Sequence, residues 1–90
     1  MISNQILQNT IDGMTSIAHV ELMVTDTDGR CVVTTMKNKA NHEAAVVEFV
    51  NSAADSQEIQ KCQFFKIFDE QQLEYILIAD GRVFTRRGSK

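Results

Sequence analysis

The stretch from Phe64 to Asp80, FFKIFDEQQLEYILIAD, contains two apolar runs separated by a short polar joint. Its aromatic and β-branched content favours two strands joined by a turn. Successive side chains of a strand point to opposite faces, and here both faces of both strands carry apolar groups. Such strands belong in the centre of a sheet, or in a sheet covered on both sides, rather than at an exposed edge. The hairpin therefore predicts further strands beside it and helices over it.

The preceding sequence supplies these elements. Apolar residues recur three and four positions apart in residues 2–17, which predicts a helix with one apolar stripe, formed by Ile2, Ile6, Leu7, Ile11, Met14 and Ile17. Alternation from Ala18 to Thr25 then predicts a strand with one buried face. The turn DTDG, in which Gly29 supplies a positive φ, and the β-branched run CVVTTM complete an antiparallel hairpin over residues 18–36.

A second helix is expected through Ala45 to Ala53, and an extension past Ala54 is left open. Asn41 is the expected N-cap, and Glu43 lies in the first turn, where a carboxylate suits the helix dipole. Asp55 with Glu58 three residues later resembles a capping arrangement, which indicates a short helical turn at 56–60.

The expected fold is α+β: a four- to five-stranded, mostly antiparallel sheet with flanking helices. The order is helix, strand, strand, helix, strand, strand, and RVFT at 82–85 is left open as a fifth strand. Strands joined by short turns pair with their neighbours, so this order closes most simply as a PAS-, profilin- or roadblock-like sheet. Ninety residues form one domain, expected at 1–81 and followed by a basic tail at 82–90.

Charge is distributed unevenly along the chain. Nine basic residues face twelve acidic ones, a net charge of −3, but four of the nine lie in 82–90, where there is no acid: Arg82, Arg86, Arg87 and Lys90. Residues 1–81 therefore hold five basic groups against twelve acidic ones, a net charge of −7. An acidic body repels phosphate, so direct nucleic-acid binding by this chain is not expected.

Cysteine usage and hydropathy indicate a cytoplasmic protein. Cys31 and Cys62 lie far apart and form no CxxC pair, which favours free thiols in a reducing compartment over zinc binding or a disulfide. No stretch reaches about 18 consecutive apolar residues, so no membrane span is expected.

No motif predicts an enzyme, a metal site or a cofactor. DTDG begins like an EF-hand loop, but Thr35 stands where the loop needs its glutamate, so a turn is expected instead. A pair of His19 with Cys31 across the first hairpin would lack an orienting group and an oxyanion hole.

The segment ahead of the second helix is the candidate binding site. Lys37, Lys39 and His42 place cationic or potentially cationic donors just before a helix N-terminus. Helix N-termini present unpaired N–H groups and the positive end of the dipole, which favours an anion such as a carboxylate or phosphate.

Four segments resemble the N-terminal sensing region of PucR/CdaR-type bacterial transcriptional regulators: ISNQILQNTIDGM, VELMVTDTDGRCVVTT, NHEAA and ADSQEIQKCQFFKIFDEQQLEYILIADG. The resemblance covers about residues 2–81. It implies a small sensor domain that precedes a helix-turn-helix and, in the sugar-diacid members, binds a diacid.

The resemblance is incomplete at the motif that accompanies diacid recognition. His42 and Glu43 match its His and Glu, whereas Ala44 stands in place of its glycine, and Lys37 to Lys39 replace a preceding segment with arginine and glycine. The family's sensor also continues into helical sequence, which GRVFTRRGSK does not resemble. We therefore expect a truncated chain whose tail, 82–90, is foreign to the domain.

Two functions remain open from the sequence. The first is a non-enzymatic sensor that binds a small anionic metabolite through Lys37, Lys39 or His42 and signals through the geometry of a homodimer. The alternative is a roadblock-like dimeric scaffold, whose order of elements is nearly the same. A dimer is expected in both cases, because a chain of this size that lacks its last helix leaves apolar surface to cover.

Overall fold

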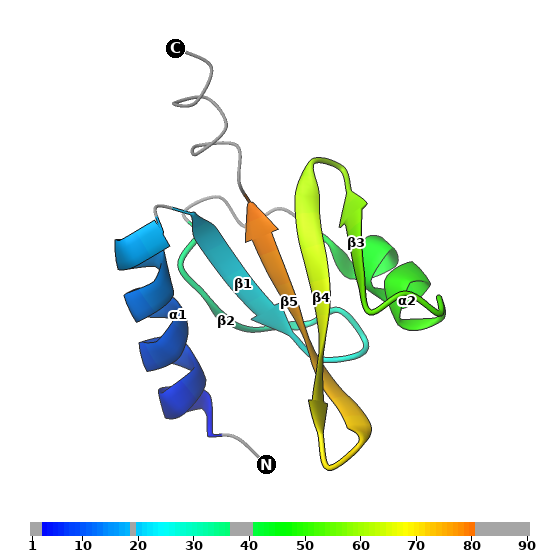
Figure 1. Cartoon of the computed structure of the whole chain (residues 1–90), viewed down its shortest axis with the longest axis horizontal. Coiled ribbons are helices and arrows are strands. Elements are labelled where there is room, and N and C mark those ends of the chain that lie inside the picture. The colour runs from blue at the N-terminus through cyan, green and yellow to red at the C-terminus, as the bar shows by residue number, and fades with distance from the viewer. Residues whose placement is uncertain (1–2, 19, 37–40, 81–90) are drawn as a thin grey trace.

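The computed structural model describes residues 3–18, 20–36 and 41–80, which form two helices and one five-stranded sheet (Figure 1). The elements, in chain order, are α1 (Asn4–Ala18), β1 (Glu21–Thr25), β2 (Cys31–Thr34), α2 (Glu43–Val50), β3 (Ser56–Ile59), β4 (Cys62–Asp69) and β5 (Gln72–Asp80). All neighbouring strands are antiparallel, in the order β2-β1-β5-β4-β3. The predicted α+β class and the antiparallel pairing of the first hairpin are confirmed.

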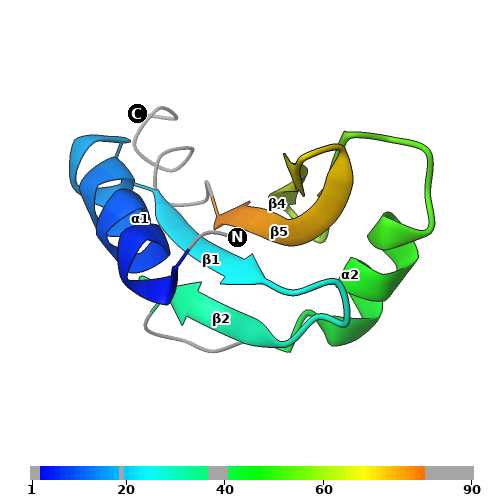
Figure 2. The same cartoon turned by 90° about the horizontal axis from the view of Figure 1, so that it is seen from below.

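Strand β5 is the centre of the sheet, between β1 and β4. The two strands predicted from Phe64 to Asp80 are β4 and β5, and neither lies at an edge, as their two apolar faces indicated. The helices lie on opposite faces of the sheet: α1 covers β1 and β2, and α2 lies behind β4 and β3 (Figures 1 and 2). No helix in the described part of the chain is long and apolar enough to cross a membrane.

The face under α2 is closed by large side chains. Its buried cluster consists of Met23, Val46, Phe49, Cys62, Phe64, Ile76 and Ile78. Phe49 and Phe64 meet edge to face with ring centroids 5.9 Å apart, a geometry that aromatic pairs prefer. Lys66 donates to the carbonyl of Ser52 at 2.6 Å and holds its ammonium 5.1 Å from the centre of the Phe49 ring. A helix of eight residues is therefore enough to close this face.

The face under α1 has a smaller buried cluster, formed by Leu7, Ile11, Leu22, Val24 and Val33. The predicted apolar stripe of α1 is wider than its contact with the sheet, because of the stripe's described residues only Leu7 and Ile11 are buried. Ile6, Met14 and Ile17 are exposed. The helix covers the half of the sheet formed by β1 and β2, and no other helix in the described part of the chain lies over the remaining half.

Two further expectations for the sheet are wrong. Residues 56–59 form the edge strand β3 rather than a helical turn, since Asp55 and Glu58 cap no helix and the backbone of 56–59 pairs with β4. Strand β1 has two buried faces instead of one, because Met23 packs under α2 while Leu22 packs under α1. The strand proposed at 82–85 lies outside the described residues.

Helix boundaries differ from expectation where the chain must turn. Helix α2 ends at Val50, before the predicted Ala53, because the hydroxyl and N–H of Ser52 both bond to the carbonyl of Phe49 and close the last turn. Helix α1 continues through Ala18, which sequence alternation had assigned to the following strand. Ala18 also fits the three-and-four spacing of the helix, so the two periods overlap there.

Candidate functional site

The candidate anion site lies at the start of α2. Lys37 and Lys39 lie outside the described residues, so the structure places only His42 of the three predicted residues. His42 occupies the N-cap position and is half-buried, and its carbonyl accepts the N–H of Val46 at 2.8 Å, the first bond of the helix. The site is thus anchored by backbone bonds at His42.

The start of the helix is stabilised by the residue before the N-cap. The side-chain oxygen of Asn41 accepts the backbone N–H of Glu43 at 2.8 Å, so Asn41 performs the predicted capping from one position upstream. His42 itself makes no side-chain capping bond. Glu43 is the acidic residue of the first turn, as expected, and its carboxylate suits the positive end of the helix dipole.

The β1–β2 turn supports this helix start from the other side. Gly29 has φ +91°, and a Cβ placed on it would lie 2.7 Å from the Cα of Glu43. The carboxylate of Asp26 accepts the backbone N–H groups of Asp28 and Arg30, each at 2.9 Å, which shapes the turn. The predicted turn at DTDG is therefore confirmed, and its glycine allows the turn to touch the first residue of α2.

The ring of His42 connects the site to the core. It meets the ring of Phe64 edge to face, with centroids 6.0 Å apart and planes at 83°. Its Nδ1 is buried and has no hydrogen-bond partner among the residues that the structure describes. A buried polar atom without a partner costs about 1–3 kcal/mol. Sequence reasoning selected His42 for its charge and could not foresee the contact with Phe64, which depends on tertiary packing.

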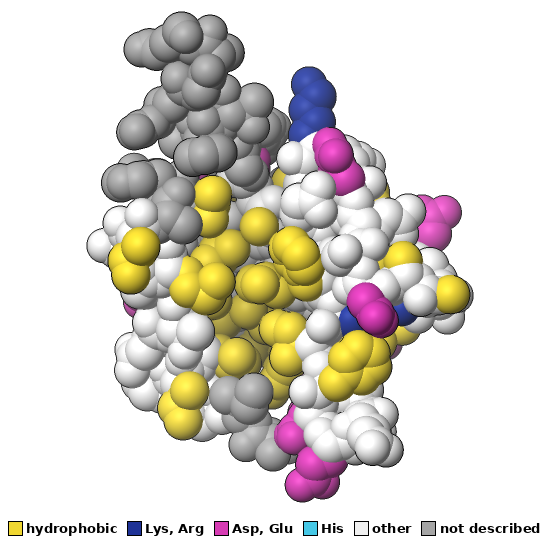
Figure 3. Space-filling view, in the orientation of Figure 1, with side chains coloured by type: hydrophobic (Ala, Val, Ile, Leu, Met, Phe, Trp, Pro, Cys, Tyr) yellow, Lys and Arg dark blue, Asp and Glu magenta, His cyan; other side chains and the backbone are white. Residues whose placement is uncertain are grey.

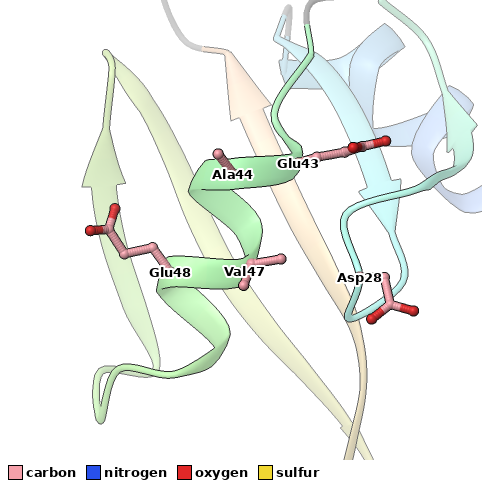
Figure 4. A pocket seen from close by; sticks show the side chains of 5 residues that line it. All are labelled: Asp28, Glu43, Ala44, Val47 and Glu48. Atoms are coloured by element: carbon pink, nitrogen blue, oxygen red, sulfur yellow. The ribbon is translucent and has the colours of Figure 1, made fainter.

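The side of α2 that faces the β1–β2 turn carries acidic residues. An open groove of about 640 Å³ between the β1–β2 turn and α2 is lined by Asp28, Glu43, Ala44, Val47 and Glu48 (Figure 4). Glu43 and Glu48 point in opposite directions, and Asp28 points away from both (Figure 4). Among the described residues, no group of three His, Cys, Asp or Glu side chains could hold a metal ion. Like charges repel an anion, so this groove does not suit an anionic ligand.

Of the remaining sequence candidates, the structure places Cys31 and Cys62 but not His19. His19 lies outside the described residues, so the pair that it would form with Cys31 is not placed. Cys31 is exposed on the edge strand β2, Cys62 is buried in β4, and the two are not joined in a disulfide, as predicted.

The described part of the site is thus a helix start with one half-buried imidazole, a capping amide and a supporting glycine turn. This arrangement can offer backbone N–H groups to a ligand, and the buried Nδ1 of His42 becomes accessible only when the ring turns outward. Comparisons of the chain with protein-family models, with curated proteins and with solved structures found no match in any of the three.

Proposed function

We propose that this chain is a non-enzymatic, cytoplasmic sensing domain of a bacterial transcriptional regulator, which binds a small anionic metabolite through Lys37, Lys39 and His42 and acts as a homodimer. The observation that supports this function best is the buried Nδ1 of His42, which lacks a hydrogen-bond partner at the start of a helix. A ligand that turns the ring outward and bonds to this atom removes the cost of leaving it unpaired.

The contact of His42 with Phe64 supplies a route for signalling. Phe64 pairs with Ile78 of the central strand, and both side chains are fully buried. A ligand that reorients the imidazole changes the packing of Phe64, and with it β4 and β5. Such a domain switches only if the ligand prefers one of the two arrangements.

Thermal-shift measurements with dicarboxylates, sugar acids and inorganic phosphate test the site. We expect at least one of these anions to raise the melting temperature of the wild type, because binding to the folded state alone stabilises it. Lys37→Ala and His42→Ala should each remove that shift. Lys61→Ala is the matched control, since Lys61 is an exposed lysine in the β3–β4 turn and is not among the predicted ligand residues.

The assignment of the site fails if no anion stabilises the wild type, or if Lys61→Ala removes the shift as completely as Lys37→Ala does. An anion shift that survives both Lys37→Ala and His42→Ala would place the ligand elsewhere on the domain.

A roadblock-like dimeric scaffold is the second candidate. It is favoured by a specific observation: among the described residues, no helix covers half of the sheet face that carries α1, and apolar side chains are exposed there. A scaffold and a sensor differ in their response to ligands. A dimer whose stability is unaffected by every anion tested would support the scaffold over the sensor.

A further inference from the structure

An open apolar strip crosses the α1 face of the sheet beyond the edge of the helix. Its residues come from β4 and β5 and are Phe65, Ile67, Tyr75, Leu77 and Ala79. Cross-strand pairing shows that they share one face, since Phe65 pairs with Leu77, and Leu77 pairs with the α1-covered Val24. In Figure 3 the apolar side chains gather in the middle of this face, over β1, β5 and β4, beside α1.

The side of α1 that borders this strip is also apolar. Gln8 and Thr15, on one side of the helix, bond to the carbonyl of Thr34 and the hydroxyl of Thr35 at the end of β2. The opposite side therefore faces away from β2, toward β5 and β4. Its residues, called here the free flank of α1, are Ile6, Thr10, Met14 and Ile17. Ile17 is 82% exposed, Ile6 58% and Met14 43%.

The free flank and the open strip form the two walls of one trough. Figure 2 shows α1 on one side of the curved sheet and the β4–β5 hairpin rising on the other side. The walls carry no charge, and the one charged residue of α1, Asp12, lies on the far side, where it accepts a bond from Gln8 at 3.0 Å. A solvated helix surface usually carries charged groups.

We propose that a second copy of this chain covers this trough, with the free flank of α1 from each copy lying on the open strip of the other. Two-fold symmetry requires that one surface be complementary to itself. This surface meets that requirement, because each copy supplies a protruding apolar helix flank and an apolar sheet strip that lacks a helix.

The size and charge of the trough fit a second copy. A stable interface needs about 1,000 Å² in total, or about 500 Å² per copy. Three large aliphatic side chains between 43% and 82% exposed, together with the strip, supply most of that area. Residues 1–81 carry five basic and twelve acidic groups, so two copies repel each other over most of their surface. The uncharged trough is where that repulsion is weakest and apolar burial is greatest.

The inference rests on the proposed function, because it names the partner through which the domain acts. Its test is nevertheless separate from the ligand test. Sedimentation measures association without any anion, and the thermal shift measures binding at Lys37 and His42. Either result can fail while the other holds.

Sedimentation velocity from about 1 to about 100 µM tests the interface. We expect the wild type to dimerise in this range. Ile17→Glu should weaken the dimer by at least about tenfold from the helix side, because it buries a charge against apolar groups. Phe65→Ser should have a similar effect from the sheet side. Val47→Glu is the matched control, since Val47 is an exposed apolar residue of α2, on the other face of the sheet.

Far-ultraviolet circular dichroism should show that each variant remains folded, and Ile17→Glu is the safest because its side chain is the most exposed. A wild type that stays monomeric at about 100 µM overturns the inference, and it would indicate that another segment covers the trough. A dimer that Val47→Glu weakens as much as Ile17→Glu also overturns it. A dimer weakened by Ile17→Glu and Phe65→Ser, but not by Val47→Glu, supports it.

Discussion

Two parallel rows of side chains cross the sheet one residue apart, and they differ in how they are covered. On the α2 face the row Met23, Ile78 and Phe64 is buried from end to end. On the α1 face the row Val24, Leu77 and Phe65 begins buried and ends exposed, with Phe65 38% exposed. Phe64 and Phe65 are adjacent in the chain, so the difference in their exposure comes from the helices that cover the two faces and not from the local sequence.

The difference shows that the length of a helix does not decide how much sheet it covers. Helix α2 has 8 residues and closes its face, because its Phe49 packs against Phe64 and Lys66 lies over the Phe49 ring. Helix α1 has 15 residues but lies mainly over β1 and β2. One face is thus a completed core, and the other keeps apolar side chains exposed, which we propose that a second copy covers.

The largest expected effect is at Phe64. Phe64→Ala should destabilise the domain by about 3–5 kcal/mol, because it removes a fully buried ring and leaves a cavity against Phe49 and His42. The neighbouring Phe65→Ala should cost about 1 kcal/mol or less in the monomer. Urea unfolding of both variants at a low chain concentration measures the difference. Equal losses at the two positions would show that the faces are equally closed.

Two glycines, Gly29 beside α2 and Gly13 in α1, are expected to respond in opposite ways to substitution by alanine. Gly29→Ala should destabilise the domain by about 2–3 kcal/mol, because a side chain at φ +91° is strained and would collide with the backbone of Glu43.

Gly13→Ala, in α1, should instead stabilise the domain by about 0.5–1 kcal/mol, since alanine favours the helix and a Cβ there meets nothing within 4 Å. Thermal unfolding of the two variants is the measurement. A neutral Gly29→Ala would mean that the turn does not rest on α2.

A similarly small effect is expected at His42, whose Nδ1 is the buried polar atom without a partner among the described residues. His42→Leu should stabilise the ligand-free domain by about 1 kcal/mol, because it removes the buried Nδ1 and keeps an apolar contact with Phe64. The same variant should lose any anion-induced thermal shift. Chemical unfolding with and without the anion measures both effects. A destabilised His42→Leu would show that the Nδ1 of His42 already makes a hydrogen bond in the ligand-free domain, so that it is not available to a ligand.

The sequence predicted the elements that carry strong periodic patterns and missed those that do not. The hairpin of β4 and β5 was clear because both strands are apolar on both faces. Strand β3, SQEI, was missed because it holds its place by backbone pairing with β4 and buries almost nothing. Its turn was also hidden, since Gln60 and Lys61 take the positive φ values that Asn and Gly usually supply.

The candidate site was predictable only in part. Charge and position selected His42 and the acidic first turn of α2, but the contact between His42 and Phe64 joins residues 22 positions apart and follows from the packing of α2 on β4. The apolar period of α1 was correct, yet it could not tell which residues would meet the sheet. Ile17 fits the stripe as well as Ile11 does, and only the position of the helix over β1 and β2 separates them.

The most direct test of an open α1 face completed by a second copy is an isotope-filtered nuclear Overhauser measurement on a mixed sample. Half of the chains carry ¹³C-labelled isoleucine methyl groups, and the other half carry unlabelled aromatic rings. We expect contacts between chains from the methyl groups of Ile6 and Ile17 to the rings of Phe65 and Tyr75. The absence of these contacts between chains, at a concentration where sedimentation shows a dimer, would contradict the account.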